Sequence, residues 1–279
     1  MSDTPRARAL AKELRAARKA AGLTLRELSE RVGWSESKLS RLETAQRGLK
    51  PAAMTVVLDA LGVTGSERDH LLKMAREIKQ PTWWEFGGGL PTQLTELADA
   101  ESRAVRITEV SEVLVPGLLQ TREHSRALFA ATGVEPERIE QRTAVRQVRQ
   151  GILTKAEPVE YLVILDEAVL CRAVGGPKVM ADQLRAMLKA AERPNITIQV
   201  VPFSAGAHTG LDGSFLILEF VRDRPIVHLE QRRSGAFLND PDDVAPFFVA
   251  RSNLQQAAMS PDETGDLIVA YAQRYDREE

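Results

Sequence analysis

The stretch LTLRELSERVGWSESKLSRLE, residues 23–43, decides the fold of the first part of the chain. Thr24 and Glu27 have the spacing of a capping box, in which each side chain accepts a hydrogen bond from the other residue's backbone N–H. Gly33 can adopt the positive φ that ends a helix. These signals predict a short helix over residues 25–32 and a sharp turn directly after it.

A second short helix is expected over residues 36–44. Ser35 offers an N-cap, and Leu39 and Leu42 recur at the spacing of one buried helical face. Because each residue advances 100° around a helix, the polar residues lie on the opposite side. The residues on that outward side are Glu36, Ser37, Ser40 and Arg41.

Similar signals extend over residues 6–78 and predict five short helices in all. Leu10, Leu14 and Ala17 recur at helical spacing before Gly22. Further along, proline suits the first turn of a fourth helix at Pro51, and serine can cap a fifth at Ser66. Residues 1–79 are therefore expected to form a compact all-α domain.

Composition and charge narrow the class of protein. The chain has 279 residues, 43% hydrophobic and 27% charged, with a single cysteine, Cys171; these values are typical of a folded protein from a reducing compartment. No apolar run reaches the length of a membrane span and no secretory signal is recognised, so a cytoplasmic protein is expected.

The net charge of −2 hides a strong asymmetry. Residues 1–79 carry 16 Lys and Arg against 10 Asp and Glu, whereas residues 80–279 carry 21 against 29. A positive first domain joined to a negative second one indicates that only the first meets a polyanion, and the expected polyanion is nucleic acid.

Residues 80–91, QPTWWEFGGGLP, interrupt all periodicity and are expected to form a linker, anchored by Trp83 and Trp84. Residues 92–279 mix helical and strand periods, which predicts an α+β domain with a mainly antiparallel sheet. The expected helices are near 94–101, 122–131, 136–150, 178–192, 242–258 and 261–275. The expected strands are 104–110, 159–165, 196–202, 214–221 and 225–230, and the last two are close enough to form a hairpin.

The outward side of helix 36–44 suits recognition of DNA in the major groove. Arg41 can form a bidentate pair with guanine, and Glu36 can accept a hydrogen bond from cytosine. Basic residues around the helix are expected to contact phosphates, which gives affinity but little sequence information. These residues are Arg26, Lys38, Arg47 and Lys50, and hydroxyl or amide contacts are expected from Thr24 and Ser35. The alternative is a helical bundle whose basic side chains are merely solvated.

Residues 14–43, LRAARKAAGLTLRELSERVGWSESKLSRLE, resemble the Xre family of λ-repressor-like helix-turn-helix regulators, and the similarity extends over residues 9–63. The resemblance implies a five-helix DNA-binding domain in which helix 36–44 reads bases. It also implies that Ser35, Glu36, Ser37 and Arg41 occupy the family's contact positions.

Residues 83–261 resemble the C-terminal domain of a large group of antitoxin-like regulators from actinobacteria. The similarity is carried by Trp83, Trp84, VPGLLQT (115–121), RQVRQ (146–150), VGGPKVM (174–180), PNITIQVVPFSAGAH (194–208) and HLE (228–230). The resemblance implies a transcription factor that is often paired with a small protein from a neighbouring gene, which acts through the second domain.

Several apolar residues of these segments have two interpretations. A partner or dimer surface would use Trp83, Trp84, Val115, Pro116, Leu118 and Leu119. Core packing explains the residues of VPGLLQT adequately, and the sequence leaves a partner or dimer surface open as the second interpretation.

No catalytic, metal or cofactor motif is recognised. The three glycines at 87–89 lack the preceding strand and the following Lys-Ser or Lys-Thr of a phosphate loop. His124, His208 and His228 lack the spacing of metal ligands, and no G-x-S-x-G nucleophile elbow is present. We therefore expect no enzyme activity, no metal and no cofactor.

Together these patterns predict a cytoplasmic, sequence-specific transcription regulator that binds double-stranded DNA and no membrane. One helix-turn-helix module buries little surface, so a homodimer on two half-sites is expected. Control is expected through the second domain, by a small partner protein or a ligand, and a ligand would need a pocket there. The alternative is an antitoxin-like interaction module that mainly holds a small partner protein and binds DNA for autoregulation.

Overall fold

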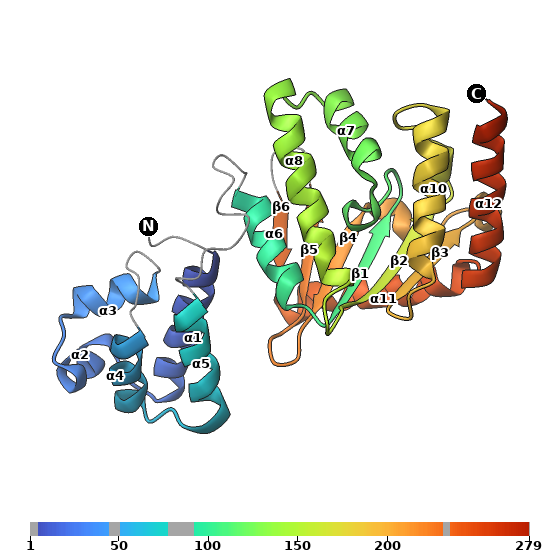
Figure 1. The fold of residues 1–279 in the computed structure, drawn as a ribbon. Helices are drawn as coiled ribbons and strands as arrows, with labels where there is room; N and C mark the ends of the chain where they lie inside the picture. The colour runs from blue at the N-terminus through green and yellow to red at the C-terminus, as the bar shows by residue number, and fades with distance from the viewer. Residues whose placement is uncertain (1–4, 45–50, 78–91, 231–234, 279) are drawn as a thin grey trace. The chain divides into compact units, whose positions relative to one another are not determined.

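The computed structural model of the chain divides into two compact units, Met1–Leu90 and Pro91–Glu279 (Figure 1). The structure describes residues 5–44, 51–77, 92–230 and 235–278. The predicted linker at 80–91 lies outside these residues, and each unit is described by itself.

The described part of the first unit consists of five helices, as predicted (Figure 1). They are α1 (Pro5–Ala20), α2 (Leu25–Val32), α3 (Glu36–Glu43), α4 (Pro51–Leu61) and α5 (Gly65–Glu77). One face of each helix contributes to a common core, in which Leu28 of α2 and Leu39 of α3 are fully buried. Burying a leucine contributes about 1.5–3 kcal/mol, so packing of these faces holds the short helices in place.

The start of α2 has the predicted capping box. Thr24 Oγ1 accepts a hydrogen bond from the Glu27 N–H at 3.2 Å, and Glu27 Oε2 accepts one from the Thr24 N–H at 2.7 Å. At the other end Gly33 has a φ of 68°, the left-handed conformation that glycine adopts without strain. Helix α2 therefore begins and ends where the sequence predicts.

Helix α3 follows directly. Ser35 Oγ accepts a hydrogen bond from the Lys38 N–H at 3.3 Å, which confirms the predicted N-cap. The helix ends at Glu43, one residue earlier than expected. A second difference concerns α5, which begins at Gly65, so that Ser66 lies inside the helix and not at its N-cap.

The second unit mixes helices and strands (Figure 1). Its helices are α6 (Thr92–Arg103), α7 (Arg122–Ala131), α8 (Pro136–Arg149), α9 (Ala168–Cys171), α10 (Pro177–Ala191), α11 (Pro241–Ala257) and α12 (Pro261–Arg277). Its strands are β1 (Arg106–Ser111), β2 (Glu160–Asp166), β3 (Ile196–Val201), β4 (Phe215–Glu219), β5 (Ile226–Glu230) and β6 (Gly235–Leu238). Strand β6 and helix α9 were not expected, because four residues are too few to show a period.

The strands form one mixed sheet in the order β3-β2-β1-β4-β5-β6. Strands β1, β2 and β3 pair in parallel, whereas the pairs β1–β4, β4–β5 and β5–β6 are antiparallel. The predicted hairpin between β4 and β5 is confirmed. The expectation of a mainly antiparallel sheet is corrected to a mixed one, because α7–α8 and α9–α10 provide helical crossovers that return the chain in parallel.

The sheet is buried on both faces. Successive side chains on a strand point to opposite faces, so Val163 of β2 packs in one core and its neighbour Ile164 in the other. The first core includes Met180 of α10 and Ile268 of α12, and the second includes residues of α11. Helices therefore cover both faces of the sheet.

Candidate nucleic-acid interface

Helix α3 turns its leucines inward and its polar residues outward. Leu39 and Leu42 are buried. On the other side Glu36, Ser37 and Arg41 are exposed, and Lys38 and Ser40 are half-buried. The structure thus brings together on one accessible face the residues that the sequence predicts for base recognition.

A buried ion pair positions α3 against α1. Arg18 Nε donates to Glu43 Oε1 at 2.6 Å and Arg18 Nη2 donates to Glu43 Oε2 at 2.9 Å. Arg18 Nη1 also donates to the carbonyl of Leu23 at 2.6 Å, and the bond to Glu43 raises the pKa of Arg18. The bidentate geometry fixes both the distance and the orientation of the two helices.

Sequence reasoning missed this ion pair. A signal does exist, since Arg18 falls eight residues after Leu10 in the apolar series that includes Leu14 and Ala17. A charged residue on the buried face of a helix requires a partner. The sequence does not indicate that the partner is Glu43, 25 residues away.

Lys38 lies over the ring of Trp34, with its ammonium 3.2 Å from the ring centroid. Such a cation–π contact holds a lysine that would otherwise be flexible. It places a positive charge beside the first turn of α3, where the sequence predicts a phosphate contact.

Arg41 is the exposed cation of this helix. Its Nε donates to the carbonyl of Ser37 at 3.2 Å, one turn earlier. No ion pair of Arg41 with an acidic side chain is found among the described residues. Its terminal guanidinium nitrogens are therefore available to an external acceptor.

The remaining predicted contact residues of α2 and α3 make local bonds. Arg26 pairs with Glu30 at 3.2 Å on an exposed surface, where such pairs contribute little. The side chains of Thr24 and Ser35 cap their helices. Two hydrogen bonds from Thr24 lower the pKa of Glu27, the larger effect coming from the backbone N–H and the smaller from the side-chain hydroxyl. The low pKa keeps a negative charge at the start of α2.

Other predicted site residues lie elsewhere. Arg47, Lys50, Trp83 and Trp84 lie outside the described residues. Val115, Pro116, Leu118 and Leu119 are buried in the second unit. The proposed partner or dimer surface from these four is therefore corrected to core packing, since Val115, Leu118 and Leu119 contact the same core as the sheet.

Neither a membrane-spanning helix nor a metal site is found in the described residues. None of the helices in residues 5–44, 51–77, 92–230 and 235–278 is long and apolar enough to cross a bilayer. In the same ranges, no three His, Cys, Asp or Glu side chains gather in a geometry that could hold a metal ion.

Comparison with known protein families covers both units. Residues 9–71 match the family described as helix-turn-helix domain, so the first unit carries the module of DNA-binding regulators. Searches of curated proteins and of solved structures found no match. Residues 94–269, more than half of the chain, match the family described as domain of unknown function (DUF5753). The chain therefore belongs to the DUF5753 family and carries a helix-turn-helix domain in front of the family's domain.

Proposed function

We propose that the chain is a sequence-specific transcription regulator that reads the major groove of double-stranded DNA with α3. The observation that carries this proposal is the helix-turn-helix match over residues 9–71, together with the exposed polar face of α3. Arg41 has the donors for guanine O6 and N7, and Glu36 can accept from cytosine N4. Ser35, Ser37 and Ser40 supply shorter polar contacts on the same helix.

The charge of the first unit supports binding to phosphates. Residues 1–79 have an excess of Lys and Arg, 16 against 10 Asp and Glu. Arg26 and Lys38 contact phosphates in this proposal, as do Arg47 and Lys50 after α3, and Thr24 adds a polar contact at the start of α2. Such contacts provide affinity that falls as salt rises.

The proposal extends to assembly and control. As in actinobacterial antitoxin-like regulators, the chain acts as a transcription factor controlled through its second domain. Because one helix-turn-helix module buries little surface, the chain acts in the cytoplasm as a homodimer on two half-sites about one helical turn of DNA apart. Its DUF5753 domain has a regulatory and not a catalytic role, needs no cofactor, and responds to a small partner protein or a ligand.

The first test is selection of binding sites by the full-length chain from a pool of random duplexes. Fluorescence anisotropy titrations of the best site follow at several salt concentrations. We expect an inverted repeat and a log–log salt slope that reflects several released counterions. Failure to enrich any sequence would count against sequence-specific recognition.

A second candidate is an antitoxin-like interaction module whose main role is to hold a small partner protein. The observation that favours it is the acidic excess of residues 80–279, 29 Asp and Glu against 21 Lys and Arg, which suits a partner with a basic surface. Co-expression with the small protein of the adjacent gene, followed by size-exclusion chromatography, distinguishes the two. A stable complex that binds only its own promoter favours the second candidate, and dimers that bind many promoters without the partner favour the first.

A further inference from the structure

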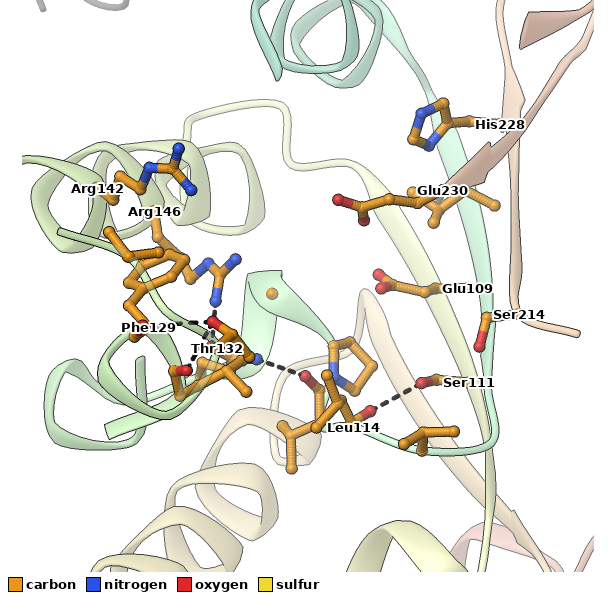
Figure 2. Close-up of a pocket in the computed structure, with 18 of the residues that line it drawn as sticks. Glu109, Ser111, Leu114, Phe129, Thr132, Arg142, Arg146, Ser214, His228 and Glu230 are labelled. Carbon is orange, nitrogen blue, oxygen red and sulfur yellow. Dashed lines mark hydrogen bonds between the residues drawn. The ribbon is translucent and has the colours of Figure 1, made fainter. Parts of the chain in front are cut away.

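The second unit contains a cavity of about 860 Å3 (Figure 2). One wall is formed by β1, β4 and β5, and the other by α7 and α8, with residues 113–117 between them. Cavities of this size hold drug-sized molecules. The volume therefore admits an organic molecule larger than a simple ion.

Opposite charges line the two walls. Glu109 of β1 and Glu230 of β5 extend from the sheet, and Arg142 and Arg146 extend from α8, one helical turn apart. Figure 2 shows the two carboxylates pointing across the cavity toward the side of the arginines. Within the described part of the chain, neither arginine forms an ion pair with Glu109 or Glu230.

Local contacts hold these groups in place. The hydroxyl of Tyr161 donates to the carboxylate of Glu109. Arg146 Nη1 donates to Gln120 Oε1 at 2.5 Å, and its guanidinium lies 4.4 Å from the ring centroid of Phe129. These contacts hold the side chains of Glu109 and Arg146 in position beside the cavity.

Some residues of the lining carry groups without partners among the described residues. Arg146 Nε and His228 Nδ1 are buried and have no hydrogen bond to any described residue, and both residues line the cavity. Arg142 forms no ion pair or hydrogen bond within the described ranges. A cationic side chain without a partner beside a cavity favours a ligand that supplies an acceptor.

The pairing of charges decides the class of ligand. A simple anion would meet the arginines but would also meet the carboxylate of Glu230 and, above about pH 7, that of Glu109, and a simple cation would face the reverse conflict. A neutral molecule would leave Arg142 and Glu230, which form no ion pair with other described residues, without a partner of opposite charge. A molecule with an anionic and a cationic end satisfies both walls at once.

We propose that this cavity binds a small amphoteric molecule, such as a short peptide, whose carboxylate pairs with Arg142 and Arg146 and whose protonated amine lies between Glu109 and Glu230. Leu128, Phe129 and Val134 line the same cavity and contact the apolar body of the ligand. The inference goes beyond DNA binding and does not depend on it, because all lining residues belong to the second unit.

The test is a thermal-shift screen of the full-length chain with free amino acids, dipeptides and tripeptides, followed by calorimetric titration of the compounds that raise the melting temperature. Each such compound is compared with its N-acetylated and its C-amidated form. We expect either modification to weaken binding roughly 10- to 100-fold, because it removes one charge-assisted contact. A screen in which no amphoteric compound stabilises the chain overturns the proposal, as do compounds that bind equally well when capped.

Two variants assign the ends of the ligand. Arg142→Ala should weaken binding of the unmodified compound and remove the difference in affinity between it and its C-amidated form. The difference in affinity between the unmodified compound and its N-acetylated form should persist. Glu230→Gln should show the reverse pattern. A general loss of structure cannot produce these opposite patterns, and both substituted side chains reach the surface of the cavity.

Arg126→Ala is the matched control. Arg126 lies on α7 and pairs with Glu140 at 2.7 Å, outside the cavity lining. Its loss removes the same charge from a neighbouring helix and should leave ligand affinity unchanged. Equal weakening by Arg126→Ala and Arg142→Ala would mean that general electrostatics, and not the cavity, governs binding.

Discussion

Two arginines of the first unit differ in what their surroundings allow. Arg18 is buried and makes a bidentate pair with Glu43, whereas Arg41 is exposed on α3. A buried paired charge fixes the relative position of two helices, but an exposed guanidinium can exchange water for a base edge. Arg18 is therefore a positioning residue and Arg41 a contact residue.

Replacing the contact residue should change specificity. Arg41→Ala is expected to cost roughly 1–3 kcal/mol on the selected site and to relax the preference for one guanine. Lys38→Ala should weaken binding to all DNA sequences more evenly, because the ammonium of Lys38 contacts phosphate in our proposal. Anisotropy titrations against the selected site and random DNA measure both effects. Equal losses on both DNAs for Arg41→Ala would contradict the base contact.

Breaking the buried pair should loosen the first unit. Glu43→Ala leaves the Arg18 guanidinium without its partner, and loss of one member of a buried pair costs about 3–5 kcal/mol. Amide hydrogen exchange of α1 and α3 in the full chain should accelerate accordingly. The double variant Arg18→Met with Glu43→Leu removes both charges and should recover most of the protection, and no recovery would mean that shape and not charge is decisive.

The second unit should lose stability as pH rises toward 7. Burial raises the pKa of Glu109 to about 7, above its ordinary value of 4.5. Between these values the folded chain binds the extra proton, so the free energy of unfolding falls with rising pH by on the order of 1–3 kcal/mol and is lowest above pH 7. The groups that act on Glu109 or share its surroundings are Tyr161 of β2, Glu101 of α6, Arg146 and Arg149 of α8, and His228 and Glu230 of β5.

Glu109→Gln should flatten this dependence, because the amide does not titrate. Urea unfolding of the full chain at pH 5 and pH 8 measures the change. Glu160→Gln is the control, since Glu160 lies on β2 in an exposed pair with Arg106 and should leave the slope as it is. If Glu109→Gln left the slope of unfolding free energy against pH unchanged, the pH dependence would arise from another titratable group.

At the scale of elements, the turn before α10 controls how closely that helix approaches α7. Gly175 has a φ of 80°, and a Cβ there would lie 2.9 Å from Ala127 Cβ of α7 and 2.9 Å from Val179 Cγ1 of α10. Gly176 has a φ of 91°, but a Cβ there would meet no atom within 4 Å. Gly175 therefore permits both a backbone conformation with positive φ and the close contact between α10 and α7. Gly176 permits only a backbone conformation with positive φ.

Alanine at these two positions should separate the effects. Gly176→Ala carries only the backbone strain of φ 91° and ψ 173°, a region essentially confined to glycine, which costs about 1–3 kcal/mol. Gly175→Ala adds the cost of overpacking, typically about 1–3 kcal/mol more. Urea unfolding of both variants tests this order. Equal destabilisation would show that α7 moves aside without cost.

At the scale of the whole molecule, the first unit and most strands of the second were predictable, but the order of the strands and their parallel pairing were not. Capping residues and glycines act within a few positions of the chain, so Thr24, Gly33 and Ser35 are sufficient to define α2 and the start of α3. Strand pairing and buried charges are different, because β1 meets β4 and Arg18 meets Glu43 across long stretches of sequence. The cavity was beyond prediction for the same reason, since its charges come from β1, β5 and α8.

The two-unit division carries a prediction about assembly. We expect the second unit to provide the dimer contact, so a chain lacking residues 1–80 should keep the oligomeric state of the full chain. Multi-angle light scattering of both proteins measures this. A monomeric remainder beside a dimeric full chain would move the dimer contact to the first unit or the linker.

The order of strands in the sheet also bears on synthesis. Strand β1 lies in the middle, and its antiparallel partner β4 begins only at Phe215. A ribosome has released all of α1–α5 long before it reaches β4, and domains generally fold as units during translation, N-terminal first. The nascent chain thus carries a complete helix-turn-helix unit while β1 still lacks one neighbour, so a prematurely terminated product keeps the first unit and exposes an open sheet edge to chaperones and proteases.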